Sequence, residues 1–266
     1  MFSVLRSVRS RYLPVYLMLL CAGFAVAGVL AIQFPETPGT GTASVVSTVA
    51  IAVPAILAVF WRLGLGRAAL SLAGLSLFAF GIETLGAASG WPYGEFSYSS
   101  ELGPKIADLV PYVLPVSYVP LVIGAAAAAE LPGLGRLPWV LGGALLLVAI
   151  DGVLDPGAAA MGLWVWPEGG AYYGVPASNY FGWLVSSIPA VLILLALGGW
   201  WGGTTPHPAM LDSAIVSLAF WTAVSASALN LLPVVLGVAL LALFLRRRRD
   251  LSGLREKGWR STGGWR

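Results

Sequence analysis

Long apolar stretches alternate with short polar ones along the whole chain. Most of these stretches approach the ~20 residues that an α-helix needs to cross a membrane. Eight can be outlined, at 12–32, 43–61, 68–88, 109–129, 137–154, 178–199, 209–226 and 229–245. The last two share one apolar block and are separated only around Ala228-Leu229-Asn230. The pattern predicts an all-α integral membrane protein, a polytopic bundle of about eight transmembrane helices.

The arginines favour eight spans over seven. Basic residues lie before the first apolar segment, and four consecutive arginines at 246–249 follow the last. Cytoplasmic loops of membrane proteins carry an excess of Lys and Arg. An even number of spans places both groups on the cytoplasmic side together with Arg62, Arg67 and Arg136, whereas seven would place 246–249 outside. We therefore predict that both termini are cytoplasmic.

Composition agrees with a membrane protein. Of the 266 residues, 58% are apolar and only 10% are charged, whereas a soluble domain carries about a quarter charged residues. The net charge of +3 comes from the clustered arginines, so it indicates orientation in the cell membrane and not nucleic-acid binding. One Cys and one His cannot build a metal site of the usual type. We expect a single transmembrane domain over 1–249 and a short polar cytoplasmic tail over 250–266.

Two loops rich in aromatic residues, 89–108 and 156–177, fall on the non-cytoplasmic side by the same parity. The second belongs to a stretch from Met161 to Trp183 in which Gly and Pro interrupt any helix. Irregular backbone near a bilayer is tolerated only where protein or a water-lined cavity surrounds it. We interpret this stretch as half of an active-site mouth in the non-cytoplasmic half of the membrane.

Three acids, Glu83, Asp151 and Asp155, lie in or at the ends of apolar segments and approach the same outer face. If the helix continues through Gly152, Asp151 and Asp155 share one side of it, about 5–6 Å apart. Two such carboxyl groups in a low dielectric resist ionising together, so one can keep a proton and act as a general acid. Acids inside membrane segments are usually functional. The alternative is that they cap helix ends and hydrogen-bond neighbouring loops, and Asp155 before Pro156 is also a turn signal.

Two blocks resemble a known family. Residues 81–104 contain E-x2-G and G-x-P-x-G-x-F-x-Y, and residues 151–183 contain D-G-V-L-D-P followed by Y-Y-G-V-P-x-x-N-x-x-G-W. In this order they resemble the multi-pass carotenoid hydratases, which include γ-carotene hydratases of bacteria and bisanhydrobacterioruberin hydratases of haloarchaea. The resemblance covers roughly 70–200. A departure lies at Tyr118, near a place where relatives are expected to have Trp, which bears on substrate preference.

The resemblance implies hydration of the terminal double bond of an acyclic (ψ) carotenoid end group, giving a tertiary alcohol without a cofactor. The partners implied are water and a membrane-dissolved linear or monocyclic carotenoid of the lycopene or γ-carotene type, so the site is expected to open sideways to lipid. An unactivated alkene needs a strong acid, a base for water, and aromatic faces for a passing cation. Glu83, Asp151 and Asp155 are the catalytic candidates, with their individual roles left open. The candidates for substrate binding are Trp91, Tyr93, Tyr98, Trp164, Trp166, Tyr172, Tyr173, Asn179 and Trp183.

Other functions fit the same residues. A lycopene cyclase uses the same protonation but excludes water. A prenyltransferase needs acid-rich metal-binding motifs for diphosphate, and Asp151-x3-Asp155 provides only half of such a motif. A proton-coupled lipid transporter would use buried acids as a proton relay.

Overall fold

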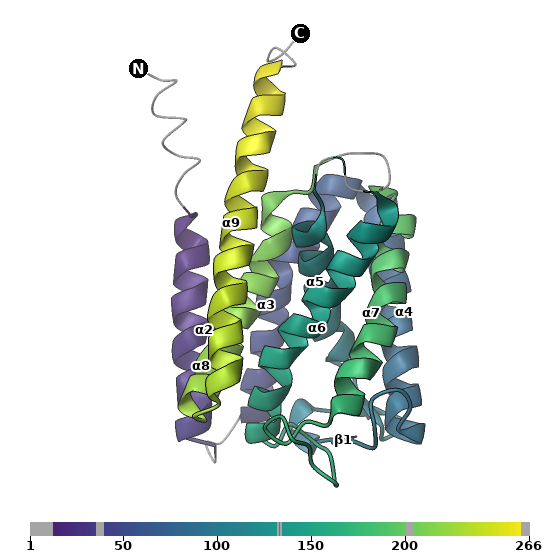
Figure 1. Cartoon of the computed structure of the whole chain (residues 1–266), viewed down its shortest axis with the longest axis vertical. Helices are drawn as coiled ribbons and strands as arrows, with labels where there is room; N and C mark the ends of the chain where they lie inside the picture. The colour runs from purple at the N-terminus through teal and green to yellow at the C-terminus, as the bar shows by residue number, and fades with distance from the viewer. Residues whose placement is uncertain (1–12, 36–39, 132, 134, 201–204, 262–266) are drawn as a thin grey trace.

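The computed structural model describes residues 13–35, 40–131, 133, 135–200 and 205–261 (Figure 1). Within these ranges the chain forms eight α-helices, which confirms the predicted all-α membrane bundle. They are α2 (Val15–Gln33), α3 (Thr40–Leu63), α4 (Leu65–Ser89), α5 (Leu114–Ala129), α6 (Arg136–Ala160), α7 (Ala177–Leu197), α8 (Asp212–Ser227) and α9 (Leu231–Ser261). Six segments, α2, α3, α4, α6, α7 and α8 with its preceding turn, are long and apolar enough to cross a membrane, and α5 is a shorter apolar helix.

The predicted break between the last two helices is confirmed. α8 ends at Ser227, Leu229 has a positive φ of 60°, and α9 begins at Leu231. Asn230 in the break is buried and donates a hydrogen bond to the carbonyl oxygen of Pro156 at 3.3 Å. α9 runs on past residue 249 to Ser261 and projects beyond the bundle (Figure 1). The division into a domain and a tail at 249 stays a prediction.

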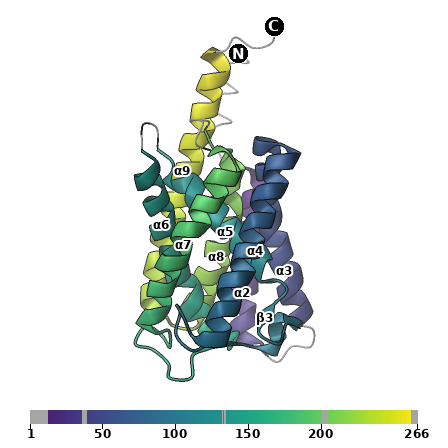
Figure 2. The same ribbon diagram turned by 90° about the vertical axis from the view of Figure 1, so that its right-hand side faces the viewer.

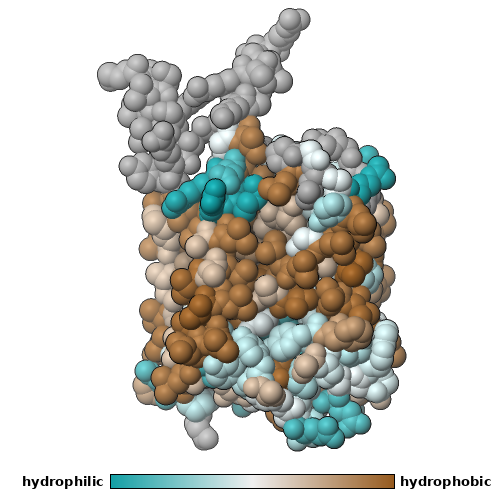
Figure 3. Space-filling view, in the orientation of Figure 1, coloured by the Kyte–Doolittle hydropathy of each residue, from teal (hydrophilic) through white to brown (hydrophobic). Residues whose placement is uncertain are grey.

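The start of α2 and the end of α9 lie at the same end of the bundle, and the loops that carry the strands lie at the other end (Figure 1). This arrangement follows from an even number of helices. The face shown in Figure 3 carries a broad apolar band across its middle, with polar residues towards both ends. The cytoplasmic assignment of the termini stays a prediction.

α5 and α8 form the core. α8 packs against α2, α3, α5, α6 and α9, and every residue of α5 from Tyr118 to Ala128 is buried. Small residues allow close packing, as is common between membrane helices. A Cβ on Gly124 of α5 would lie only 2.6 Å from the Cβ of Ala214 on α8. Figure 2 shows α5 and α8 enclosed by the outer helices.

A buried ion pair ties three helices together at the end opposite the strands. The guanidinium of Arg248 on α9 donates to the carboxylate of Asp212 at the start of α8, with 2.5 Å between Nε and Oδ1. The hydroxyl of Tyr16 on α2 donates to the same carboxylate. The short 3-10 helix η3 (Pro208–Leu211) leads into this pair.

The two aromatic loops lie at the same end of the bundle, as predicted from parity, and they also lie side by side. β1 (Ser97–Tyr98) of the first loop pairs antiparallel with β4 (Trp164–Val165) of the second, and Tyr98 lies opposite Trp164. The first loop also contains η1 (Ser100–Leu102) and a hairpin of β2 (Lys105–Ile106) with β3 (Val110–Pro111). The segment predicted to span 109–129 therefore becomes helical only from Leu114.

Candidate active site

Each aromatic loop places a hydrogen-bond donor on one of the predicted acids. The Tyr98 hydroxyl donates to Oε2 of Glu83 at 2.7 Å, and the Trp164 indole N–H donates to Oδ1 of Asp155 at 3.0 Å. Because β1 and β4 pair at this register, the rings of Tyr98 and Trp164 meet edge to face with centroids 6.0 Å apart. The paired loops thus hold the acids of α4 and α6 at one place.

The helical path of α6 brings Asp151 and Asp155 together. α6 continues through Pro156 to Ala160, so the alternative that Asp155 marks a turn is wrong. Proline has no N–H to donate to the carbonyl four residues before it, here that of Gly152. The Tyr172 hydroxyl donates to this carbonyl at 3.1 Å and satisfies it. The helix therefore tolerates Pro156, and both acids lie one turn apart on the same face.

Asn179 on α7 bridges the two aspartates. Its Nδ2 donates to Oδ2 of Asp151 at 3.3 Å and also to Oδ2 of Asp155. Asp151 and Asp155 are each 2% exposed, Asn179 is 3% exposed and Glu83 4%. Burial this complete disfavours charge, and neighbouring carboxyl groups disfavour it further.

Oδ1 of Asp151 is buried without a hydrogen-bond partner among the described residues, and the Asp151 carboxyl interacts with that of Asp155. A proton on Oδ1 of Asp151 would let this oxygen donate a hydrogen bond to Asp155, because a carboxylic acid can donate to a neighbouring carboxylate. The pair is therefore suited to hold one proton and one negative charge.

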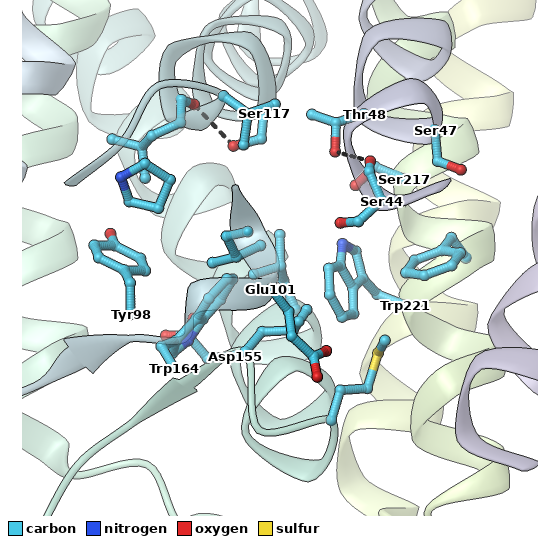
Figure 4. Close-up of a pocket in the computed structure, with 18 of the residues that line it drawn as sticks. Ser44, Ser47, Thr48, Tyr98, Glu101, Ser117, Asp155, Trp164, Ser217 and Trp221 are labelled. Carbon is cyan, nitrogen blue, oxygen red and sulfur yellow. Dashed lines mark hydrogen bonds between the residues drawn. The ribbon is translucent and has the colours of Figure 1, made fainter. Parts of the chain in front are cut away.

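A cavity of about 660 Å³ opens beside the acids. Glu83, Asp155 and Asn179 line it, whereas Asp151 lies behind Asp155 and does not. Aromatic side chains form much of the wall: Tyr93, Phe96, Tyr98, Tyr118, Trp164, Trp166, Trp183, Phe220 and Trp221. Figure 4 shows Tyr98, Trp164 and Asp155 on one side of the hollow, with Trp221 and the hydroxyl side chains of Ser44, Thr48 and Ser217 across from them.

Tyr93 is wedged between α4 and α7 at two glycines. A Cβ on Gly86 would lie 2.6 Å from Cδ2 of the Tyr93 ring, and a Cβ on Gly182 would lie 2.5 Å from Cδ1. Burial, and then the nearby Glu83, raise the pKa of the Tyr93 phenol above its ordinary value. The same two causes raise the pKa of Tyr98. Both phenols therefore stay neutral at any ordinary pH.

The structure brings most of the predicted site residues together. Glu83, Asp155, Asn179, Tyr93, Tyr98, Trp164, Trp166 and Trp183 all line the cavity. Trp91, Tyr172 and Tyr173 do not line it. Trp91 is 55% exposed, and the hydroxyls of Tyr172 and Tyr173 bond to backbone groups of α6 and α9. The contacts of these two tyrosines support helix geometry, and their role in substrate binding stays a prediction.

Sequence reasoning missed one whole wall of the cavity. α2 with the residue after it, α3 and α8 contribute Leu30, Phe34, Ser44, Thr48, Ser217 and Trp221, and η1 contributes Glu101. In apolar segments the same residue types face lipid, protein or a cavity, so no local signal marks this wall. Tyr118, which was singled out as a departure, does line the cavity and stacks on Trp183 with centroids 5.6 Å apart.

Within the described part of the chain, no group of three or more His, Cys, Asp or Glu side chains is arranged to hold a metal ion. The expectation that the protein uses neither metal nor cofactor stays a prediction.

Sequence comparison with known proteins finds a matching family and a similar hydratase. The sequence model for carotenoid biosynthesis proteins matches residues 39–244. A bisanhydrobacterioruberin hydratase of Haloarcula japonica is 37% identical over 181 residues, which cover 63% of this chain and 59% of the relative. The match thus spans less than two thirds of the relative's length. No solved structure matches the chain.

Proposed function

This chain belongs to the carotenoid biosynthesis protein family, and we propose that it acts as a carotenoid hydratase. It adds water to the terminal carbon–carbon double bond of an acyclic (ψ) end group of a membrane-dissolved carotenoid and leaves a tertiary hydroxyl. The observation that carries the proposal is a group of buried carboxyl side chains at the wall of an aromatic cavity. The name of the similar hydratase supports the same reaction type.

Glu83 is the proton donor in this proposal. It lines the cavity, and its Oε2 already accepts the Tyr98 hydroxyl, which leaves Oε1 as the atom that carries the transferable proton. Transfer of that proton to the less substituted alkene carbon makes a tertiary carbocation, and Glu83 becomes a carboxylate. The neutral Tyr98 phenol then donates to a charged acceptor, a stronger hydrogen bond than before. Tyr98 thus stabilises the state that protonation produces.

Asp155 is the base that positions water. It accepts N–H donors from both Trp164 and Asn179, and hydrogen bonds to the charged form favour a carboxylate. Water attacks the cation with its oxygen and gives a proton to Asp155. That proton returns to Glu83 through water in the cavity, so the net reaction is the addition of one water molecule. Asp151 lies behind Asp155 and acts as a positioning residue that donates to it.

Aromatic rings stabilise the carbocation between its formation and the attack of water. Rings attract positive charge at their faces, and Tyr118, Trp164, Trp183 and Trp221 all line the cavity. No Lys or Arg is among its lining residues in the described chain. The environment therefore favours a transient cation and offers no basic side chain for a diphosphate, which counts against a prenyltransferase.

The hydroxyl side chains favour hydration over cyclisation. Ser44, Thr48 and Ser217 face the hollow across from Asp155 (Figure 4). A cavity holds water where polar partners are available. A cyclase needs the same cation but must keep water away, so these side chains distinguish the two reactions.

Coexpression with a pathway that makes lycopene or γ-carotene tests the proposal. We expect a new pigment heavier than its precursor by one water molecule. Glu83→Gln and Asp155→Asn should abolish it while the protein still accumulates in the membrane. Glu95→Gln and Glu168→Gln are matched controls, because these exposed acids lie in the same two loops but do not line the cavity. Unchanged pigment with the unaltered protein, or a cyclised product of unchanged mass, would overturn the assignment.

A further inference from the structure

The cavity is bounded on one side by two helices that scarcely touch each other. α2 packs chiefly on α8, and α3 packs on α4, α5 and α8, but α2 and α3 make almost no direct contact in the described residues. α8 lies behind the gap, and its Ser217, Phe220 and Trp221 line the cavity. A gap between α2 and α3 with α8 as its floor therefore leads to the acids.

The side chains along this gap face both the cavity and the outside. Leu30 of α2 and Phe34, which directly follows α2, line the cavity and are 48% and 59% exposed. Ala27 and Ala31 of α2 and Ser47 of α3 also line it. A side chain that lines a cavity and is also exposed marks an opening.

The opening lies in the apolar parts of two helices long enough to cross a membrane. The cavity-lining segments 27–34 and 43–51 contain no charged residue and, apart from Phe34 just after α2, belong to α2 and α3, two of the helices apolar enough to span. They extend about 12 Å along each helix at 1.5 Å per residue, from the end that carries the aromatic loops. At that end η1 packs on the first turns of α3, where a Cβ on Gly41 would lie 3.1 Å from the Glu101 carbonyl oxygen.

The volume of the cavity indicates what passes through this opening. About 660 Å³ lies within the range of ~300–1,000 Å³ that drug-sized ligands occupy. The parts of α2 and α3 that line it extend only about 12 Å along each helix, much less than the length of an extended carotenoid, so the cavity holds an end group and part of a polyene. The rest of the molecule must lie outside the cavity, and an apolar chain outside it is stable only in lipid.

We propose that the gap between α2 and α3 is a lateral portal through which one end of a carotenoid enters from the bilayer, its polyene tail remaining in lipid. The portal consists of Ala27, Leu30 and Ala31 on α2, Phe34 directly after α2, and Ser44 and Ser47 on α3. The identity of the substrate rests on the proposed function, whereas the portal itself is a property of the fold. α2 is held at its far end by the Tyr16–Asp212–Arg248 hydrogen bonds and, next to Ala27, by Gly28, which packs directly on the Phe220 backbone. Leu30, Ala31 and Phe34 follow both attachments along the chain.

Bulky substitutions test the portal through turnover. Ala31→Trp and Ser47→Trp, one on each side, should slow formation of the hydrated pigment by about tenfold or more. Ala22→Trp and Ala50→Trp place the same side chain on the same helices at exposed positions that do not line the cavity, and should leave turnover unchanged.

A labelling experiment tests the portal without the reaction. In a Cys21→Ala background, Ser217→Cys places one thiol on the buried floor of the cavity. In lipid vesicles, a maleimide with a long alkyl chain should label this thiol faster than a charged, water-soluble maleimide. Ala31→Trp or Ser47→Trp should slow the lipid-soluble reagent by about tenfold, and the two control substitutions should not.

The two experiments separate the portal from the proposed function. If the unaltered protein makes no hydrated pigment but labelling behaves as described, the portal is supported and the proposed function is wrong. If hydration proceeds and neither turnover nor labelling responds to Trp at 31 or 47, the function stands and the portal is wrong. Faster labelling by the water-soluble reagent, or equal slowing by the control substitutions, also overturns the portal.

Discussion

Asn179→Leu removes the bridge between the two aspartates at nearly constant side-chain volume. Asn179 donates to both Asp151 and Asp155 and is almost completely buried. Its loss leaves Asp155 with Trp164 as its one remaining N–H donor in the described structure. A hydrogen bond to a charged group contributes about 1.5–3 kcal/mol. If the Asp155 carboxylate positions water, losing this hydrogen bond raises the free energy of the transition state by the same amount.

That free energy converts directly into a rate. At about 1.4 kcal/mol for each factor of ten, turnover should fall roughly 10- to 150-fold. Initial rates of hydrated pigment formation, divided by the amount of protein in the membrane, measure the effect. The unfolding temperature of the purified protein shows whether the variant is folded.

The chain offers a matched control, because it contains one other asparagine. Asn230 is also buried, but it donates to the Pro156 carbonyl and not to an acid. Asn230→Leu should lower the free energy of unfolding by about 0.5–1.5 kcal/mol and leave the rate per folded molecule unchanged. If Asn179→Leu turns over as fast as the unaltered protein, or if Asn230→Leu is equally slow, Asn179 does not hold a catalytic base.

Three further substitutions test the packing and charges around the site. Gly182→Ala should lower the free energy of unfolding by about 1–3 kcal/mol, because its Cβ would overlap the Tyr93 ring and the Pro92 backbone. Gly81→Ala is the control and should be neutral or stabilising, because a Cβ there has nothing within 4 Å. Equal unfolding temperatures of the two variants would contradict this. Asp212→Asn should lower the free energy of unfolding by about 3–5 kcal/mol, because it leaves the buried Arg248 charge without its partner. The double variant Asp212→Leu with Arg248→Met should recover most of this free energy, as measured by denaturation of the purified protein. Because its raised pKa makes folded Tyr98 hold its proton more tightly than the unfolded chain, stability should be lost as pH rises past ~10. Tyr98→Phe should flatten that loss in unfolding temperature measured against pH, and an unchanged slope would contradict the assignment.

The sequence predicted the helices and the position of the acids well, because both depend on patterns that a membrane enforces. Apolar length identified the helices, and arginine parity placed Glu83, Asp151 and Asp155 on one face. The resemblance to carotenoid hydratases singled out the loop residues, whose roles stay predictions, and the comparisons confirm the family resemblance itself. Pairing of Tyr98 with Trp164 was not visible, because two-residue strands leave no periodic signal.

Other features depended on tertiary contacts. Asp155-Pro156 resembles a turn signal, yet α6 passes through it because Tyr172 satisfies the carbonyl that Pro156 leaves without a donor. Tyr172 and Tyr173 resembled binding residues by composition, but their hydroxyls are engaged with backbone. The α2–α3 wall gave no signal, because a helix surface that faces lipid and one that faces an apolar cavity have the same residues.

Isotope incorporation tests the hydratase assignment most directly. The purified protein is incubated with lycopene or γ-carotene in water enriched in heavy oxygen and deuterium, and the product is analysed by mass spectrometry. We expect the new hydroxyl oxygen to come from water and one solvent deuterium to appear on the adjacent carbon, both lost in Glu83→Gln. A hydroxyl oxygen from dissolved dioxygen, or a product without solvent deuterium on that carbon, would contradict protonation of the alkene by a buried carboxylic acid.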